Sequence, residues 1–431
     1  MKPKLLIIQA AALGHELTRQ AGMEQLGELP IRSAETIFPA VTCSVQAGFR
    51  TASPVSAHGM AANGRYFPEL HKVLFWEQSA DLVAGRRFWS DFRAEGGKVG
   101  MLFWQQSMGE ELDMVVSPAP IHKHHGGMIQ DCYTQPPGLY RRLVDAAGRT
   151  FKLQDYWGPK AGFQAGNWIA GATARILAAD DAPDLLLTYL PTLDYDLQRY
   201  GPLDDRAQVA LNILRLQIEG LIQMAGKTGH EVMIFGDYAI GGVSGPAVLP
   251  NLALAEAGLF AVRDVRGMLY PDFHTSRALA VVDHEVAIIH VPDPADVDRA
   301  ASVLGELEGV QRVITVEEMA GMDLDHPHCG QLLCIAEPGR WLAYPWWSRK
   351  GQAPDYAGHI DIHNKPGFDP CELFFARLPI RISQDTSKIS GSHGRIGPDR
   401  RVAWACSFQP VGEIENILDL ARAAQKFLED K

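Results

Sequence analysis

Short, wholly apolar segments that alternate with longer amphipathic ones set the fold class of this chain. The strand candidates are KLLIIQA, ETIFPAVT, KVGMLFW, DLLLTYLP and EVMIFGD, at residues 4–10, 35–42, 98–104, 184–191 and 231–237. The segment ALNILRLQIEGLIQMAGKTG, residues 210–229, has the spacing of a helix and ends on Gly229. Short apolar strands joined by helices predict an α/β fold, with a mostly parallel sheet covered by helices on both faces.

A later part of the chain has a different pattern. Residues 276–319 are typical of a strand, a helix and a strand, with VPDPAD at the start of the helix. The following PGRWLAYPWW, residues 338–347, predicts a pair of strands packed with aromatic side chains. We therefore expect an α/β core formed by residues 1–260 and 386–431, and a smaller α+β insertion or cap at residues 261–385.

Composition excludes several function classes. Lys and Arg number 40 against 51 Asp and Glu, for a formal net charge of −11. An acidic chain without a basic run is not typical of a protein that binds duplex nucleic acid or a membrane surface. We expect a small phosphate-containing substrate as the partner, and the sequence leaves the oligomeric state open.

The cysteines and the N-terminus indicate a cytoplasmic protein. The six cysteines form no CxxC pair, which in a long chain is typical of reduced thiols. No segment approaches the roughly 18 apolar residues of a membrane helix. The N-terminal MKPKLLIIQAAALGHEL has a short apolar part that contains Gln9, so we interpret it as a first buried strand and not as a signal peptide.

Polar residues follow three of the apolar segments. Thr42 follows IFPAV, Asp194 follows LLLTYLPTL, and Asp237 follows VMIFG. The carboxyl ends of parallel strands meet at one edge of a sheet, where α/β folds place their binding sites. Each Asp alone is better explained as a turn or helix cap; the joint occurrence of the three polar residues favours a common site.

The most informative stretch is TIFPAVTCSVQAGFRTASPVSAHGMAANGRYF, residues 36–67. It places a Thr-Cys dipeptide where an apolar segment ends, and a Gly- and Asn-rich turn follows. One interpretation is a strand followed by a helix that Thr42 caps. The other is a nucleophilic hydroxyl held at a helix N-terminus, where free backbone N–H groups and the helix dipole favour bound phosphate.

This stretch resembles the nucleophile region of the type I phosphodiesterase/nucleotide pyrophosphatase branch of the alkaline phosphatase superfamily. In that branch a Thr begins a helix and a phosphate-binding Asn follows, as Thr42 and Asn63 do here. YLPTLDYDLQRYGP and IFGDYAIGGV resemble its metal-binding strand ends, and GSHGRIG resembles its C-terminal His-Gly motif. The resemblance implies an alkaline-phosphatase-like α/β fold, and metal ligands at Asp194, Asp237 and His393.

Three positions depart from the pattern of the branch. Gln9 stands in place of an Asp, and Gln198 and Tyr238 each stand in place of a His. Glutamine and neutral tyrosine are weak zinc ligands compared with carboxylate and imidazole. DIHNKPGFDPCELFF, residues 361–375, resembles a bacterial subgroup that has similar segments, so the departures are expected to be shared within that subgroup.

Replacement ligands are present in YAGHIDIHNKPGFDPCE. If this segment is extended, His359, Asp361 and His363 lie on one face, and His363 is the first candidate for an added ligand. A polar strand followed by a turn explains the segment as well. IHKHHGG, residues 121–127, indicates a solvated loop or a lid over the substrate, and both it and DHPHC, residues 325–329, are weaker metal candidates. Arg277 is better explained by a surface salt bridge than by a substrate clamp.

Three functions remain open at this stage. The resemblance implies a metal-dependent phosphohydrolase or phosphodiesterase acting on a phosphate ester or nucleotide-like substrate through Thr42. The cofactor would be one or two divalent ions, zinc first, with manganese or magnesium as alternatives. A phosphoryl-transferring mutase of the same superfamily is a related possibility. The different class is a superfamily member that no longer hydrolyses and serves as a binding or assembly protein in a biosynthetic pathway.

Overall fold

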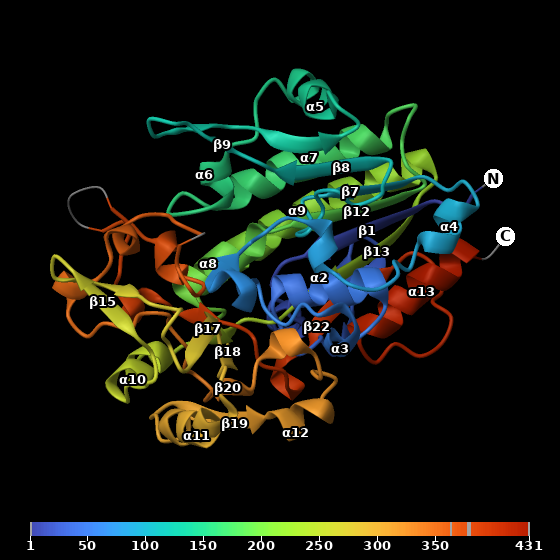
Figure 1. Ribbon diagram of the computed structural model, residues 1–431. Helices are drawn as coiled ribbons and strands as arrows, with labels where there is room; N and C mark the ends of the chain where they lie inside the picture. The colour runs from blue at the N-terminus through green and yellow to red at the C-terminus, as the bar shows by residue number, and fades with distance from the viewer. Residues whose placement is uncertain (1, 363, 377–380, 430–431) are drawn as a thin grey trace.

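A computed structural model describes residues 2–362, 364–376 and 381–429 of the chain, and an eight-stranded sheet lies at its centre (Figure 1). The strands, in order across the sheet, are β11 (Cys132–Gln135), β8 (Met114–Pro118), β7 (Val99–Leu102), β12 (Leu185–Leu190), β1 (Leu5–Ala10), β13 (Glu231–Gly236), β22 (Val402–Cys406) and β4 (Arg32–Ala34). Strands β8, β7, β12, β1 and β13 run parallel to one another, and β11, β22 and β4 add antiparallel pairs at the edges. The predicted α/β fold with a mostly parallel sheet is confirmed.

Four of the five predicted strand segments form central strands, as β1, β7, β12 and β13. The segment at residues 35–42 does not: β4 ends at Ala34, and no strand follows it before the next helix begins at Thr42. Pro39 lies in the middle of this segment and has no N–H for a sheet ladder, which explains why an apolar run here is not a strand.

Helices cover both faces of the central sheet (Figure 1). Helices α7 (Phe163–Leu177) and α9 (Asp205–Thr228) pack on each other and on β12, β1 and β13. On the other face, α2 (Thr42–Thr51) packs against α13 (Ile417–Glu429). The predicted helix at residues 210–229 is the greater part of α9, and Gly229 ends it with a left-handed backbone conformation.

A second, antiparallel sheet lies beside the central one, at the lower left of Figure 1. Its order is β17 (Leu279–Asp283), β18 (Val286–His290), β20 (Leu332–Ala336) and β19 (Val310–Thr315), with α10 (Pro250–Glu256) and α11 (Val297–Gly305) packed near it. The predicted strand before α11 is thus a hairpin of two strands. Because this sheet uses only residues 279–336, we propose the domain boundaries expected above, near residues 260 and 386.

The aromatic segment at residues 338–347 forms no strand pair, contrary to expectation. It runs irregularly past the second sheet, and its Trp341 and Trp346 are buried. Two prolines and a glycine within ten residues remove ladder donors and favour turns, so burial of the aromatic rings, and not strand pairing, orders this segment.

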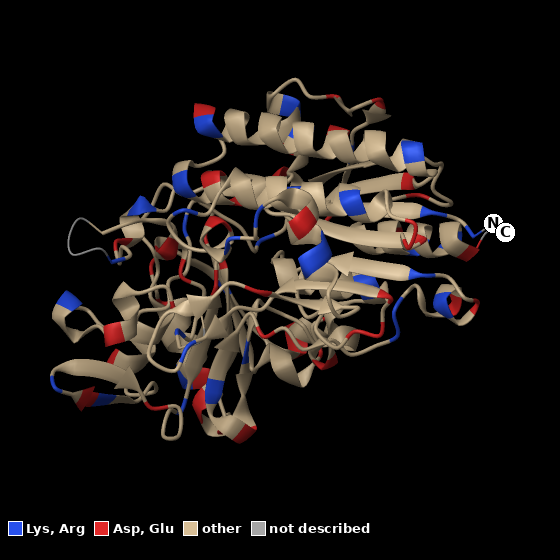
Figure 2. Ribbon diagram, turned by 90° about the horizontal axis from the view of Figure 1, so that it is seen from above, with Lys and Arg blue, Asp and Glu red and all other residues tan. Residues whose placement is uncertain are grey.

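Charged residues of both signs are spread over the periphery, while β1, β7 and β12 carry none (Figure 2). Within the described residues, no helix combines the length and the apolar content needed to cross a bilayer.

Candidate active site

Thr42 is the first residue of α2 and is 3% exposed. Val41 holds the N-cap position, and it has no hydroxyl with which to cap the helix. Thr42 lines a pocket together with Asn63 and Tyr238. Thr42 therefore stands at a helix N-terminus as predicted, but its side chain is turned toward other residues of the pocket. The geometry favours the interpretation as a functional hydroxyl over the interpretation as a cap.

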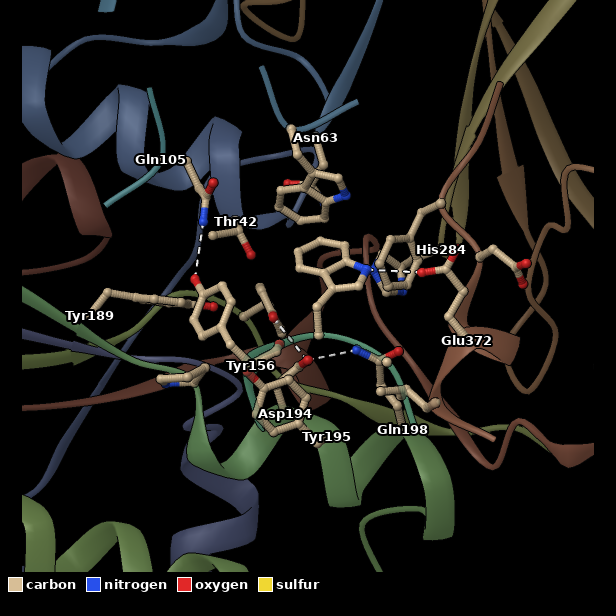
Figure 3. Close-up of a pocket in the computed structure, with 18 residues that line it drawn as sticks. Thr42, Asn63, Gln105, Tyr156, Tyr189, Asp194, Tyr195, Gln198, His284 and Glu372 are labelled. Atoms are coloured by element: carbon tan, nitrogen blue, oxygen red, sulfur yellow. Dashed lines mark hydrogen bonds between the residues drawn. The ribbon is translucent and has the colours of Figure 1, made fainter. Parts of the chain in front are cut away.

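Asn63 lines the same pocket as Thr42 (Figure 3). Hydrogen bonds to two neighbouring residues hold it in place. Its Oδ1 accepts a hydrogen bond from the Cys43 N–H at 2.9 Å, which ties it to the first turn of α2. Its backbone N–H and its Nδ2 donate to the two carboxylate oxygens of Asp283, at 2.6 and 3.1 Å. Burial raises the pKa of Asp283 to about 7, against the effect of these two hydrogen bonds.

The two predicted carboxylates lie beyond the ends of parallel strands. β1 pairs with both β12 and β13, so the carboxyl ends of the three strands share one edge of the sheet. Asp237 follows β13 directly, and Asp194 lies in the first turn of α8 (Thr192–Tyr200), which follows β12. Both are buried, and burial raises the pKa of Asp194 to about 6 and that of Asp237 to about 7, although hydrogen bonds oppose the shift.

Each carboxylate accepts hydrogen bonds from the residues that depart from the family pattern. Asp194 accepts from Gln198 Nε2 at 2.7 Å, as Figure 3 shows, and from the Tyr238 hydroxyl at 2.9 Å. Asp237 accepts from Gln9 Nε2 at 2.9 Å. The backbone N–H groups of Ala12 and Tyr238 also donate to Asp237, each at 2.9 Å.

Three rings stack behind these carboxylates. The Tyr238 ring lies 3.5 Å from the His393 ring, centroid to centroid, and His284 lies 3.7 Å from His393 on another side. His393 Nδ1 donates to the Ala40 carbonyl at 2.7 Å. Burial lowers the pKa of His393 to about 3 and that of His284 well below its ordinary value, so both imidazoles are neutral at physiological pH.

These residues, as they are arranged, do not fit the two-metal centre that the resemblance implies. Tyr238 contacts each of the three implied ligands, since its hydroxyl donates to Asp194, its backbone N–H donates to Asp237, and its ring stacks on His393. In the part of the chain that the structure describes, no three His, Cys, Asp or Glu side chains are arranged to hold a metal ion. The roles of Asp194, Asp237 and His393 as ligands stay a prediction, and metal analysis below tests it.

The replacement ligands expected from residues 359–372 have other partners. Residues 359–362 form no strand, and His363 lies outside the described residues. Lys365 is 1% exposed and donates to Asp369 and Glu372, at 2.7 Å in each case. Asp369 and Glu372 line the pocket, so a buried lysine, and not a metal ion, balances their charge.

The remaining motifs lie elsewhere. IHKHHGG forms an exposed hairpin of β9 (Ile121–His122) and β10 (Met128–Ile129), and none of its residues lines the pocket. His328, of DHPHC, hydrogen-bonds the Gly59 carbonyl at 3.1 Å. Arg277 pairs with Asp296, as the salt-bridge interpretation expected.

The pocket is narrow, with a cavity volume of about 60 Å³. Aromatic side chains form much of its wall, among them Trp76 and Trp157, whose ring centroids are 4.8 Å apart. Trp157 Nε1 also donates to Glu372 Oε2 at 2.9 Å. Trp104 is fully buried against Phe49 and belongs to the core. The lining residues include no Lys or Arg among those described.

Sequence reasoning missed Asp283 and His284, which hold Asn63 and extend the ring stack. Asp283 ends β17, in the sequence VVDHE, so the pattern of a polar residue after an apolar strand was present there too. That strand was assigned to the insertion, and only the tertiary structure brings its end to the pocket.

A mostly parallel sheet with a threonine at a helix N-terminus and buried carboxylates at the strand ends is the arrangement of the alkaline phosphatase superfamily. The sequence matches the type I phosphodiesterase/nucleotide pyrophosphatase family over residues 23–369, and the chain belongs to that family. The family consists of hydrolases that act on phosphoester bonds. No curated protein matches the chain significantly.

Solved structures confirm the fold. The phosphonoacetate hydrolase of Sinorhizobium meliloti 1021, in complex with phosphonoformate, superposes with a TM-score of 0.63 at 14% identity, over 99% of this chain and 96% of the other. Murine ectonucleotide pyrophosphatase/phosphodiesterase 5 gives 0.62 at 13% identity, over 99% and 95%. An inactive threonine-to-alanine variant of the murine protein in complex with AMP gives 0.63 at 13% identity, over 100% and 96%.

Proposed function

We propose that the protein hydrolyses a small phosphate ester, with Thr42 as the nucleophile. The observation that carries the proposal is the position of Thr42 at the start of α2, in one pocket with Asn63 and with its hydroxyl free of any capping role. The N–H groups of the first turn of a helix provide a site for a phosphoryl group that needs no charged side chain. Asn63 Nδ2 has a second hydrogen beside the one given to Asp283, and this hydrogen is available to a phosphoryl oxygen.

The reaction follows from this arrangement. The Thr42 oxygen attacks phosphorus, a Thr42–phosphate bond forms, and the bond to the leaving oxygen breaks. The Thr42 proton is taken up by the Tyr238 hydroxyl, which lines the same pocket and passes its own proton to Asp194 along the hydrogen bond between them. Water then attacks phosphorus, releases phosphate and restores the Thr42 hydroxyl. Asn63 stabilises the charge that develops on the phosphoryl oxygens.

The aromatic wall supports a substrate with a planar group. Trp76 and Trp157 line the same pocket as Asn63 and Asp194, and aromatic faces stack well on planar rings. The enclosed volume of about 60 Å³ holds only the phosphoryl end of such an ester, so its planar group would lie against the tryptophans toward the open side. AMP is a ligand of a fold neighbour, which is consistent with this proposal but does not carry it.

A binding function without turnover is the second candidate, and a specific observation favours it. Gln9, Gln198 and Tyr238 engage the carboxylates that the family uses for metal ions. A pocket without metal ions can still bind a phosphate ester through the N-terminus of α2 and through Asn63. Such a protein would bind AMP and release no product.

The test compares Thr42→Ala with Thr42→Ser. Both variants keep α2, because the Thr42 side chain makes no cap. We expect Thr42→Ala to lose hydrolysis of p-nitrophenyl phosphate, bis-p-nitrophenyl phosphate and AMP, and Thr42→Ser to retain part of it. Equal turnover in Thr42→Ala and the wild type would overturn the nucleophile. No turnover in the wild type, with saturable binding of AMP by calorimetry, would favour the second candidate.

A further inference from the structure

The three departures from the family pattern act together in this structure. Gln9, Gln198 and Tyr238 come from β1, α8 and the loop after β13, so they are far apart in the sequence. Each places a hydrogen-bond donor on one of the two carboxylates that are implied as metal ligands. Because all three residues donate to the same pair of carboxylates, they indicate that the metal centre as a whole is replaced, and not that single ligands are lost.

Every carboxylate oxygen of the pair has a donor from the protein. Oδ2 of Asp194 accepts from Gln198 and Oδ1 from Tyr238; Oδ2 of Asp237 accepts from Gln9 and Oδ1 from two backbone N–H groups. An ionised carboxylate only accepts hydrogen bonds, so the side-chain amides must present their nitrogen to it. Gln9 is 0% exposed and Gln198 2% exposed, so these contacts lie away from solvent. Each of these carboxylate oxygens therefore accepts at least one hydrogen bond without a cation, whereas the buried Oε1 atoms of Gln9 and Gln198 have no partner among the described residues.

Tyr238 occupies the central position in this network. Its hydroxyl donates to Asp194, its backbone N–H donates to Asp237, and its ring covers the face of His393. It also lines the same pocket as Thr42. Tyr238 is thus the one residue of the three that contacts all the side chains implied as metal ligands and stands in the pocket of the nucleophile.

We propose that hydrogen-bond donors from Gln9, Gln198 and Tyr238 replace the family's metal ions in this protein, and that the Tyr238 hydroxyl takes over the activation of Thr42. The role of Tyr238 in activating Thr42 rests on the proposed function. The replacement of the metal ions does not rest on it, because metal content is measured without an assay of turnover.

The first experiment measures zinc in the full-length protein. The wild type and the variant Gln9→Asp/Gln198→His/Tyr238→His are purified without chelator, incubated with zinc, desalted and analysed by mass spectrometry of the metal. We expect no bound zinc in the wild type and two ions per chain in the rebuilt variant, the number used by two-metal phosphatases. Tyr156→His adds an imidazole to the same pocket at none of the three substituted positions, and it is expected to bind none.

The outcomes separate clearly. Zinc in the wild type that is lost in Asp194→Asn would overturn the proposal. A rebuilt variant that folds, by circular dichroism, and binds no zinc would overturn the assignment of these three positions. If the rebuilt variant does not fold, the zinc content of the wild type, compared with that of Asp194→Asn, decides the question alone.

The second experiment tests Tyr238 at the nucleophile. Tyr238→Phe keeps the ring against His393 and removes only the hydroxyl. We expect a fall in kcat of about 100-fold or more, the range for loss of a positioned proton acceptor, with KM little changed. Wild-type turnover should resist a chelator. Activity in the wild type with full activity in Tyr238→Phe would overturn this role, whereas inactivity of the wild type would count against the proposed function and leave the zinc result standing.

Discussion

The Tyr238 ring lies flat against the His393 ring, with 3.5 Å between the centroids and 3° between the planes. This contact fixes the phenol so that its hydroxyl reaches Asp194 at 2.9 Å. The His393 imidazole, which the resemblance implies as a metal ligand, thus stacks on a tyrosine ring here. His284 packs on His393 in turn, and because His284 follows a strand of the second sheet, residues of both sheets support the tyrosine.

Tyr238→Phe should cost more stability than the removal of another buried phenol. The hydroxyl donates to an acidic group, and a hydrogen bond to a charged group contributes about 1.5–3 kcal/mol, compared with about 1 kcal/mol between neutral partners. The control is Tyr195→Phe, because the Tyr195 hydroxyl donates to the neutral Tyr156 carbonyl at 2.9 Å. Urea unfolding measures both. Equal losses would mean that Asp194 is neutral or that water replaces the phenol.

Asp283 should make a contribution to stability that falls as the pH rises from about 4 to about 7, whatever the sign of the total slope. Burial raises its pKa from 3.8 to about 7 in the folded protein, so the folded state holds a proton that the unfolded state has lost over this range. The stabilisation is complete below the unfolded pKa and disappears as the pH passes the folded one. Asp237, with a pKa raised to about 7, acts in the same direction.

Asp283→Asn removes one of these protons. The slope of unfolding free energy against pH should shift toward positive values by up to about 1.4 kcal/mol per pH unit, the value for one proton. The surface variant Asp181→Asn is the control, since this carboxylate pairs with Arg142 in solvent. Urea unfolding at pH 4, 5, 6 and 7 provides the slopes. An unchanged slope in Asp283→Asn would show that Asp283 is ionised throughout.

Lys365→Met should destabilise the protein strongly. Lys365 is buried between Asp369 and Glu372, and its removal leaves two buried carboxylates without a cation. Breaking a buried pair from one side costs about 3–5 kcal/mol. Adding Glu372→Gln should restore part of the loss, because fewer charges then remain uncompensated. Lys2→Met, at an exposed pair with Glu95, should change stability by less than about 1 kcal/mol. Thermal unfolding distinguishes the cases.

Trp157→Ala should weaken the binding of nucleotide-like esters. An aromatic pair contributes about 0.5–1.5 kcal/mol beyond simple burial, or up to about tenfold in affinity. Trp157→Phe keeps an aromatic face and loses the hydrogen bond to Glu372, so it separates stacking from the bond. Calorimetry with AMP and with methyl phosphate, which has no ring, gives the comparison. A similar change for both ligands would argue against a stacking role.

Much of the fold followed from local patterns. The apolar segments at residues 4–10, 98–104, 184–191 and 231–237 became central strands because strands covered on both faces need continuous apolar residues. Residues 35–42 have similar composition but did not pair, since a proline interrupts the ladder. Residues 338–347 likewise show that buried aromatic rings do not require a sheet.

The sequence by itself indicated which edge of the sheet carries the buried carboxylates: Asp194 and Asp237 follow the segments of β12 and β13, and parallel pairing with β1 brings the ends of these strands together. The segment before Thr42 forms no strand, so tertiary packing places Thr42. Only the tertiary structure decided what surrounds these residues. Hydrogen bonds between Gln9 and Asp237, or between Asp283 and Asn63, join residues more than 200 positions apart. The spacing of apolar residues along a strand or helix indicates which face of that element a residue occupies. The partner of a buried polar group depends on how distant segments pack, and here that packing decides whether the carboxylates face metal ions or donors of the protein itself.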